Sequence, residues 1–191
     1  VSVGGLCIGA TLALALAAEE SGVLSLALLS VTLNYDGWTI PWYHWMLNLA
    51  YKTPIRDFYS LRERTPYGLK NTALRAKVAK GMQLRGDSEI GAASLSMHHI
   101  YEAKALSRFV YKNISSVTAD CLLIHAIDDD VSTTANAERV YSRVGSQRKR
   151  KIYLDNCYHI ITVDNERELV ASETRWFFEE AAELHRTASA P

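Results

Sequence analysis

Apolar and polar positions along the chain alternate between continuous hydrophobic runs and amphipathic stretches, the pattern of an α/β protein. Residues 23–33 and 121–126 are apolar runs with the length and composition of strands that are covered on both faces. Residues 8–19 form an apolar stretch long enough for a buried helix. The other predicted elements are short strands at 1–3 and 151–154 and helices at 71–84, 94–110, 134–144 and 166–184. The last of these helices is expected to be capped by Asp164 or Asn165 and to turn Leu169 toward the core.

The order of these elements predicts a parallel sheet with crossover helices. Residues 1–33 and 118–191 are expected to form the two parts of one α/β core. Residues 34–117 hold three of the four tryptophans and are expected to form a helical insertion between them. The basic run at 148–151 is interpreted as a solvated turn that leads into a strand.

Composition and charge exclude several classes of protein. The 191 residues are 48% hydrophobic and 22% charged, with 21 acidic and 21 basic side chains, so no nucleic-acid-binding surface is indicated. The three cysteines, Cys7, Cys121 and Cys157, are odd in number and widely spaced, which fits a reducing compartment and predicts a cytoplasmic protein. Glu19 and Glu20 interrupt the apolar N-terminal region, so neither a membrane span nor a signal peptide is predicted.

The segment Gly5-Leu6-Cys7-Ile8-Gly9 has the pattern of a nucleophile elbow with cysteine in the nucleophilic position. Such a sharp turn from a strand to a helix holds its nucleophile at strained backbone angles, and small flanking residues let strand and helix approach. The amide of Ile8 is therefore the expected oxyanion donor. The alternative for Cys7 is a small buried core residue at the start of a helix.

An acid and a histidine follow in the order that a catalytic triad on such a sheet requires. The run Asp128-Asp129-Asp130 comes directly after the strand predicted at 121–126, and His159 lies on a loop before the last helix. One of these carboxylates is expected to orient His159 as general base. The alternative is a solvated acidic turn. No metal site is predicted, because the spacing of the acidic residues is not that of a calcium loop.

Two segments resemble the C-terminal half of α/β-hydrolase carboxylesterases and monoacylglycerol-lipase-like enzymes. Residues 121–131 resemble their strand and acid loop, and in that register Asp129 takes the acid position with Asp128 as the second candidate. Residues 157–164 resemble their histidine loop, S-G-H-x-x-T-x-D, with Cys157-Tyr158 in place of Ser-Gly. The resemblance implies an α/β-hydrolase fold in which residues 34–117 form a helical cap over the site.

The elbow itself is similar to the G-x-C-x-G segment of polyhydroxyalkanoate synthases, which are cysteine acyltransferases, and dienelactone hydrolases also use cysteine at this turn. We therefore predict a hydrolase that cleaves a carboxylic ester or thioester through an acyl-cysteine, with a triad of Cys7, His159 and Asp129 and no cofactor. The substrate would be a small acyl ester or thioester. The alternatives are an acyltransferase and a catalytically inactive hydrolase-like binding protein; the oligomeric state is left open.

Two further expectations concern the cap and the start of the chain. Trp38, Trp42 and Trp45 are expected either to line an acyl pocket or to form the core of the cap. The chain starts in a strand with Val1 rather than methionine, so we expect a fragment that lacks the early strands. The second oxyanion donor of this fold follows an earlier strand, so this chain is expected to be weakly stable and poorly active alone.

Overall fold

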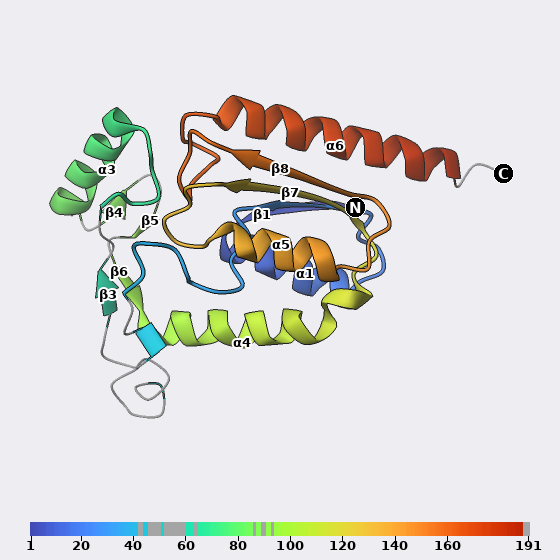
Figure 1. Ribbon diagram of the computed structural model, residues 1–191, viewed down its shortest axis with the longest axis horizontal. Helices are drawn as coiled ribbons and strands as arrows, with labels where there is room; N and C mark the ends of the chain where they lie inside the picture. Colours follow the sequence, from blue (N-terminus) through green and yellow to red (C-terminus); the bar gives the residue numbers. More distant parts are fainter. Residues whose placement is uncertain are drawn as a thin grey trace.

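A parallel four-stranded sheet forms the centre of the computed structural model, which describes residues 1–41, 44–45, 51, 60–62, 65–85, 87–88, 91–92 and 94–188 (Figure 1). Its order is β1-β2-β7-β8, and the register pairs Leu26 with Cys121 and Ile124 with Ile152. The predicted parallel sheet is confirmed. The strands are β1 (Ser2–Leu6), β2 (Ser25–Leu29), β7 (Asp120–Ala126) and β8 (Lys149–Leu154).

Helices cover both faces of this sheet (Figure 1). Helices α1 (Ile8–Glu19) and α5 (Thr134–Arg143) lie on one face, and α6 (Arg167–Ala188) lies on the other. Helix α4 (Met97–Asn113) packs against α1, and the short helix η3 (Ile114–Ser116) follows it. Among the described residues, no helix combines the length and the apolar character that crossing a membrane requires.

The elements between β2 and β7 lie beyond the carboxyl ends of the sheet strands, except for α4 and η3 (Figure 1). They fall in the segment predicted as a cap, 34–117, and that division of the chain into domains stays a prediction. The C-terminal end of α4 places Val110 in the same hydrophobic cluster as Leu14 of α1. The remaining elements here are β3 (Ser60–Arg62), α3 (Thr72–Arg85), β4 (Asp87–Ser88), β5 (Gly91–Ala92) and β6 (Ser94–Ser96).

The hydrophobic side chains of β2 and β7 point alternately into two clusters, one on each face of the sheet. Leu26 and Leu123 pack toward α1 and α5, while Leu122 and Phe177 pack between the sheet and α6. Because each strand contributes to both clusters, its sequence reads as an unbroken apolar run. Burial of these side chains supplies the main stabilising free energy of the fold.

Three local expectations were wrong. The strand expected over 23–33 ends at Leu29, because Ser30 turns the chain with a φ of 44°. Strand β8 begins at Lys149, so the basic run lies in an edge strand, where charged side chains discourage pairing with other chains. Leu169 of α6 was expected to face the core and is instead 42% exposed.

The two glycines of the turn between β1 and α1 differ in the space available for a side chain. A Cβ at Gly5 would lie 2.3 Å from the backbone of Gly9, whereas a Cβ at Gly9 would have nothing within 4 Å. The close approach expected of both glycines is therefore required only of Gly5.

We predict that Gly5→Ala lowers the free energy of unfolding by about 1–3 kcal/mol, the usual cost of an overpacked site. Gly9→Ala, a matched change four residues away, should raise it by up to about 1 kcal/mol because alanine favours the helix. Urea unfolding monitored by circular dichroism measures both. Equal stability of the two variants would contradict this reading of the turn.

Candidate active site

Cys7 lies at the tip of the turn from β1 to α1 with a backbone conformation that is rare outside glycine. Its φ is 58° and its ψ is −121°, and α1 begins at the next residue, Ile8. The Cys7 amide donates to the carbonyl of Leu29 at 2.9 Å, which anchors the turn to the end of β2. Strain of this kind persists where the surrounding structure enforces it, and it commonly marks a functional position.

Asp129 and His159 are brought together at the carboxyl end of the sheet. The Nδ1 atom of His159 lies 2.9 Å from Oδ1 and 2.8 Å from Oδ2 of Asp129, and both side chains are buried. Oδ1 also accepts hydrogen bonds from the amides of Val131, at 2.9 Å, and Ser132, at 2.8 Å. The carboxylate is therefore fixed in orientation and able to select the His159 tautomer with a proton on Nδ1.

The second candidate acid, Asp128, occupies a different environment. Its side chain is 56% exposed and forms an ion pair with Nζ of Lys70 at 2.9 Å. The geometry therefore distinguishes two adjacent aspartates that sequence reasoning left open, and it places Asp129 against the histidine.

The electrostatics of Cys7 and His159 favour an ion pair. Burial alone raises the pKa of the Cys7 thiol, but the charge of His159, with the Thr32 hydroxyl and the Ile8 amide, outweighs it and lowers that pKa. Burial alone lowers the pKa of His159, but Cys7 and Asp129 together hold it well above its usual range. A thiolate facing an imidazolium is the form of the pair that these opposing shifts support.

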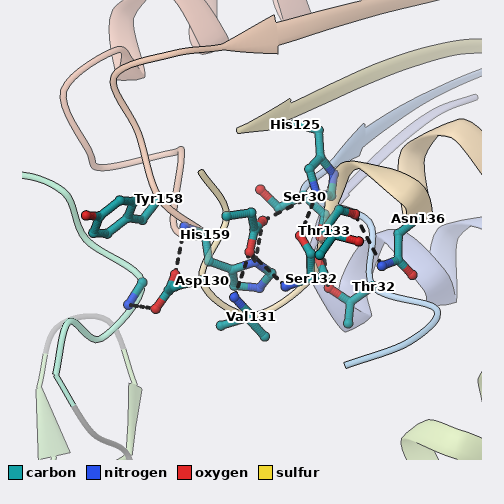
Figure 2. A network of polar contacts seen from close by, with 12 residues as sticks. Ser30, Thr32, His125, Asp130, Val131, Ser132, Thr133, Asn136, Tyr158 and His159 are labelled. Carbon is teal, nitrogen blue, oxygen red and sulfur yellow. Dashed lines mark hydrogen bonds and ion pairs between the residues drawn. The ribbon is translucent and has the colours of Figure 1, made fainter. Parts of the chain in front are cut away.

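Asp130 and Asp164 are buried carboxylates that sequence reasoning missed as part of the site. Asp130 accepts hydrogen bonds from the amides of Gly68, at 3.2 Å, and His159, at 3.3 Å (Figure 2). Asp164 had been expected to cap the last helix. Its carboxylate instead accepts hydrogen bonds from the amides of Lys70 and Asn71, and from the amide of Tyr158 in the histidine loop, at 2.7 to 2.9 Å.

These two carboxylates join the chain that returns from the predicted cap, residues 68–71, to the histidine loop. The amide of Ile160 adds a hydrogen bond to the carbonyl of Gly68 at 2.8 Å. A Cβ at Gly68 would lie 2.6 Å from Ile160, so glycine is required at this contact. In the sequence, the one feature that could have indicated this role is the place of Asp164 at the last position of the S-G-H-x-x-T-x-D pattern.

A mostly apolar cavity of about 450 Å³ lies on α6, and a second of about 370 Å³ lies beside the elbow. The volume of the second cavity is within the range of small-molecule binding sites. It lies between Ile8 and the predicted cap helix α4; its described lining is Ile8, Tyr35, His99, Glu102, Ala103 and Leu106.

Among the described residues, neither Trp38 nor Trp45, both expected in an acyl pocket or in the core of the cap, lines this cavity. Trp38 is 61% exposed, stacks edge-on against Tyr158 at 5.6 Å, and donates from Nε1 to the carbonyl of Asp128 at 3.3 Å. Trp45 is exposed, and Trp42 lies outside the described residues. Figure 2 shows the ring of Tyr158 directed away from the imidazole of His159, so the Trp38–Tyr158 contact lies to one side of the triad residues.

Comparison with known proteins identifies the family of the chain. A family model described as serine aminopeptidase, S33, matches residues 1–167. The chain belongs to this family of α/β-hydrolases. Among curated proteins, no sequence matches significantly. The family description names serine, whereas this chain has Cys7 at the elbow.

Solved structures of lipolytic enzymes share the fold. The metagenome-derived lipolytic enzymes LipS and LipT are represented by a structure that superposes with a TM-score of 0.74 at 19% identity, over 94% of this chain and 64% of that one. The monoacylglycerol lipase of Paleococcus ferrophilus gives 0.74 at 16% identity, over 92% of this chain and 66% of that one. A soluble variant of the Saccharomyces cerevisiae monoglyceride lipase gives 0.67 at 13% identity, over 92% and 61%. The chain thus spans less than two thirds of each of these proteins.

No group of three metal-binding side chains is present among the described residues. Proton transfer and nucleophilic attack by Cys7 are the chemistry that the arrangement of the site supports.

We predict that iodoacetamide modifies Cys7 first among the three cysteines at neutral pH, because the thiolate is the reactive form. Burial raises the pKa of both Cys121 and Cys157 to about 12, so these two remain protonated thiols. The rate at Cys7 should fall only when the pH drops below its lowered pKa, as peptide mass spectrometry over a pH series would show.

The His159→Ala variant supplies the control, since loss of the imidazolium returns the pKa of Cys7 toward or above its ordinary value. Its Cys7 alkylation at neutral pH should slow by about tenfold or more, corresponding to a shift of at least one pKa unit. An unchanged rate would show that His159 does not act on the thiol.

Proposed function

We propose that this chain carries the catalytic machinery of an acyl hydrolase that cleaves a carboxylic ester or thioester through an acyl intermediate on Cys7. The observation that carries the proposal is the buried contact of His159 with Asp129, together with the strained elbow that holds Cys7. Family membership and the lipolytic enzymes of the same fold support the same class of reaction.

In the first half of the proposed reaction, the Cys7 thiolate attacks the substrate carbonyl carbon and a tetrahedral intermediate forms. The Ile8 amide at the N-terminus of α1 donates to its oxyanion. As the intermediate collapses, the bond to the leaving alcohol or thiol breaks and that group takes a proton from Nε2 of His159. Nδ1 is held by Asp129, so Nε2 is the nitrogen left for proton transfer.

In the second half, water attacks the acyl-cysteine while Nε2 of His159 accepts its proton. The carboxylic acid is released, and the Cys7 thiolate and the His159 imidazolium are restored. Asp129 stays ionised throughout and stabilises the imidazolium, as the carboxylate does in related triads.

The cavity beside Ile8 supports an ester with an apolar acyl or alcohol group of modest size. It opens next to the expected oxyanion donor, so a group bound there would continue from a carbonyl held at the elbow. The structures of the same fold described as monoacylglycerol lipase and monoglyceride lipase make a fatty acyl ester of a small alcohol the first substrate to try. Trp38 would then contact the substrate only at the rim of the site.

Acyl transfer to an alcohol remains the second candidate, and Cys7 is the observation that favours it. A cysteine nucleophile forms a thioester, which retains enough acyl-transfer potential for a hydroxyl acceptor to replace water. Product analysis distinguishes the two, since transfer yields a new ester and hydrolysis yields a free acid.

The first test is the intact mass of the chain after brief exposure to a short-chain p-nitrophenyl ester. We expect an acyl adduct that maps to Cys7 and decays in water. Cys7→Ala should form none, whereas the matched variant Cys121→Ala should behave like the parent because Cys121 is buried in the core. Absence of an adduct, with Cys7 and His159 variants unchanged, would favour a binding protein without catalysis.

Asp129→Asn should slow adduct formation by about a thousandfold or more, because an amide stabilises the wrong histidine tautomer. Asp128→Asn is the matched control one residue away, and its exposed carboxylate predicts a rate within about twofold of the parent. Comparable losses in the two variants would contradict the assignment of Asp129.

Ala103→Phe should narrow the cavity beside Ile8 and discriminate against long acyl chains. We expect adduct formation from a p-nitrophenyl octanoate to fall by about tenfold or more, since a filled pocket loses the burial of several methylene groups. The acetyl ester, too short to need the cavity, is the internal control and should react as before. An equal fall in the rate of adduct formation for both esters would show that the acyl chain does not bind in this cavity.

A further inference from the structure

A second histidine, His125 of β7, lies against the carboxylate of Asp129 and has no part in the reaction described above. It is fully buried, with an exposed fraction of 0%. Its Nε2 lies 2.9 Å from the carbonyl oxygen of Ser132 and 3.4 Å from Oδ2 of Asp129. The other buried residues of β7 are apolar, and a polar ring at this depth costs free energy unless it is hydrogen-bonded, so a role for its polar atoms is expected.

The position of its proton follows from its partners. A carbonyl oxygen only accepts hydrogen bonds, so Nε2 of His125 carries the hydrogen that Ser132 receives. Burial lowers the pKa of His125 more than the nearby charges of Asp129 and Asp36 raise it, so the ring is neutral and Nδ1 is unprotonated. The ring therefore donates its one N–H to the Ser132 carbonyl, and the Asp129 carboxylate lies beside this hydrogen bond, with Oδ2 3.4 Å from Nε2.

The two oxygens of Asp129 are thus held by different groups. Oδ1 accepts from the amides of Val131 and Ser132, and these backbone contacts fix one end of the carboxylate. Oδ2 has no backbone donor among the contacts described and lies between Nδ1 of His159 and Nε2 of His125. Figure 2 shows His125, Val131, Ser132 and His159 among the labelled members of this network.

We propose that His125 is a positioning residue for the Cys7–His159 pair. Its Nε2–H holds the carbonyl of Ser132, and the amide of Ser132 in turn holds Oδ1 of Asp129, so that the carboxylate stays directed at Nδ1 of His159. The inference rests on the proposed function, because it concerns the same triad. It assigns His125 no contact with substrate.

Two effects of removing His125 oppose one another. Loss of a donor leaves more negative charge on Asp129, which favours the His159 imidazolium, whereas loss of orientation weakens the hydrogen bond to Nδ1. The contact to His125 is long, at 3.4 Å, and the two amides on Oδ1 remain, so the change in charge is the smaller effect. Loss of orientation should therefore dominate and weaken the pair.

The test measures iodoacetamide modification of Cys7 against pH in His125→Leu, His125→Gln and Leu123→Ala. The glutamine amide nitrogen extends about as far from the backbone as Nε2, so it restores the donor. Leu123, buried on the same face of β7, is the control for loss of packing without loss of the contact to Asp129. Circular dichroism confirms that each variant is folded.

In His125→Leu we expect the pKa of Cys7 to rise and its alkylation at neutral pH to slow by up to about tenfold, the scale of one buried hydrogen bond. The rates should converge with the parent at a pH above the ordinary thiol pKa of about 8.5, where no imidazolium is needed. His125→Gln should recover most of the neutral-pH rate, and Leu123→Ala should keep the parental pH profile. The charged and titratable groups that face the pair, Asp129, Asp130 and Asp36, are unchanged in all three variants.

A parental pH profile in folded His125→Leu would overturn the inference, as would an equal shift in Leu123→Ala or no recovery in His125→Gln. His159→Ala separates this failure from failure of the proposed function. If His159→Ala slows alkylation and His125→Leu does not, only the role of His125 is wrong; if neither does, the triad itself is absent.

Discussion

The buried carboxylate of Asp129 is the constraint on which the arrangement of the site depends. A charge removed from water is tolerated only when hydrogen bonds and opposite charge replace its hydration. Asp129 obtains these from the acid loop, which supplies two backbone amides, and from His159 on the next loop. The same contacts that make its burial tolerable also fix the orientation of the histidine.

The histidine loop is held in addition by two carboxylates that belong to the framework rather than to the proposed chemistry. Asp130 and Asp164 bind backbone amides of this loop and of residues 68–71 at the same time. A histidine on an unsupported loop would lose its alignment with the elbow. Here the same hydrogen bonds hold both residues 68–71, where the chain returns from the predicted cap, and the loop that carries His159. A change in the position of the cap would therefore change the position of the imidazole.

Cysteine at the elbow changes the starting point of the proposed reaction. A serine must lose its proton as it attacks, whereas a thiol with a lowered pKa beside an imidazolium is already ionised. Orientation of His159 then matters twice, first to maintain the ion pair and then to deliver the proton to the leaving group. A further positioning residue such as His125 is consistent with that double requirement.

The sequence by itself determined the fold class and the residues that could react. Continuous apolar runs predicted the central strands, because a strand covered on both faces has no polar side, and the order of Cys7, the aspartates and His159 predicted a triad-like site. Element ends were less well predicted: the end of β2 depends on the turn at Ser30, and the exposure of Leu169 depends on how α6 lies on the sheet.

Only the tertiary structure decided which aspartate meets the histidine and that Gly5, not Gly9, is required by close packing. It also decided that the cavity by the elbow lies between Ile8 and α4, without Trp38 or Trp45 in its described lining. The reason is physical. Spacing along the chain places a residue on a loop, but the environment of its side chain depends on the burial and hydrogen-bond partners that segments distant in sequence provide.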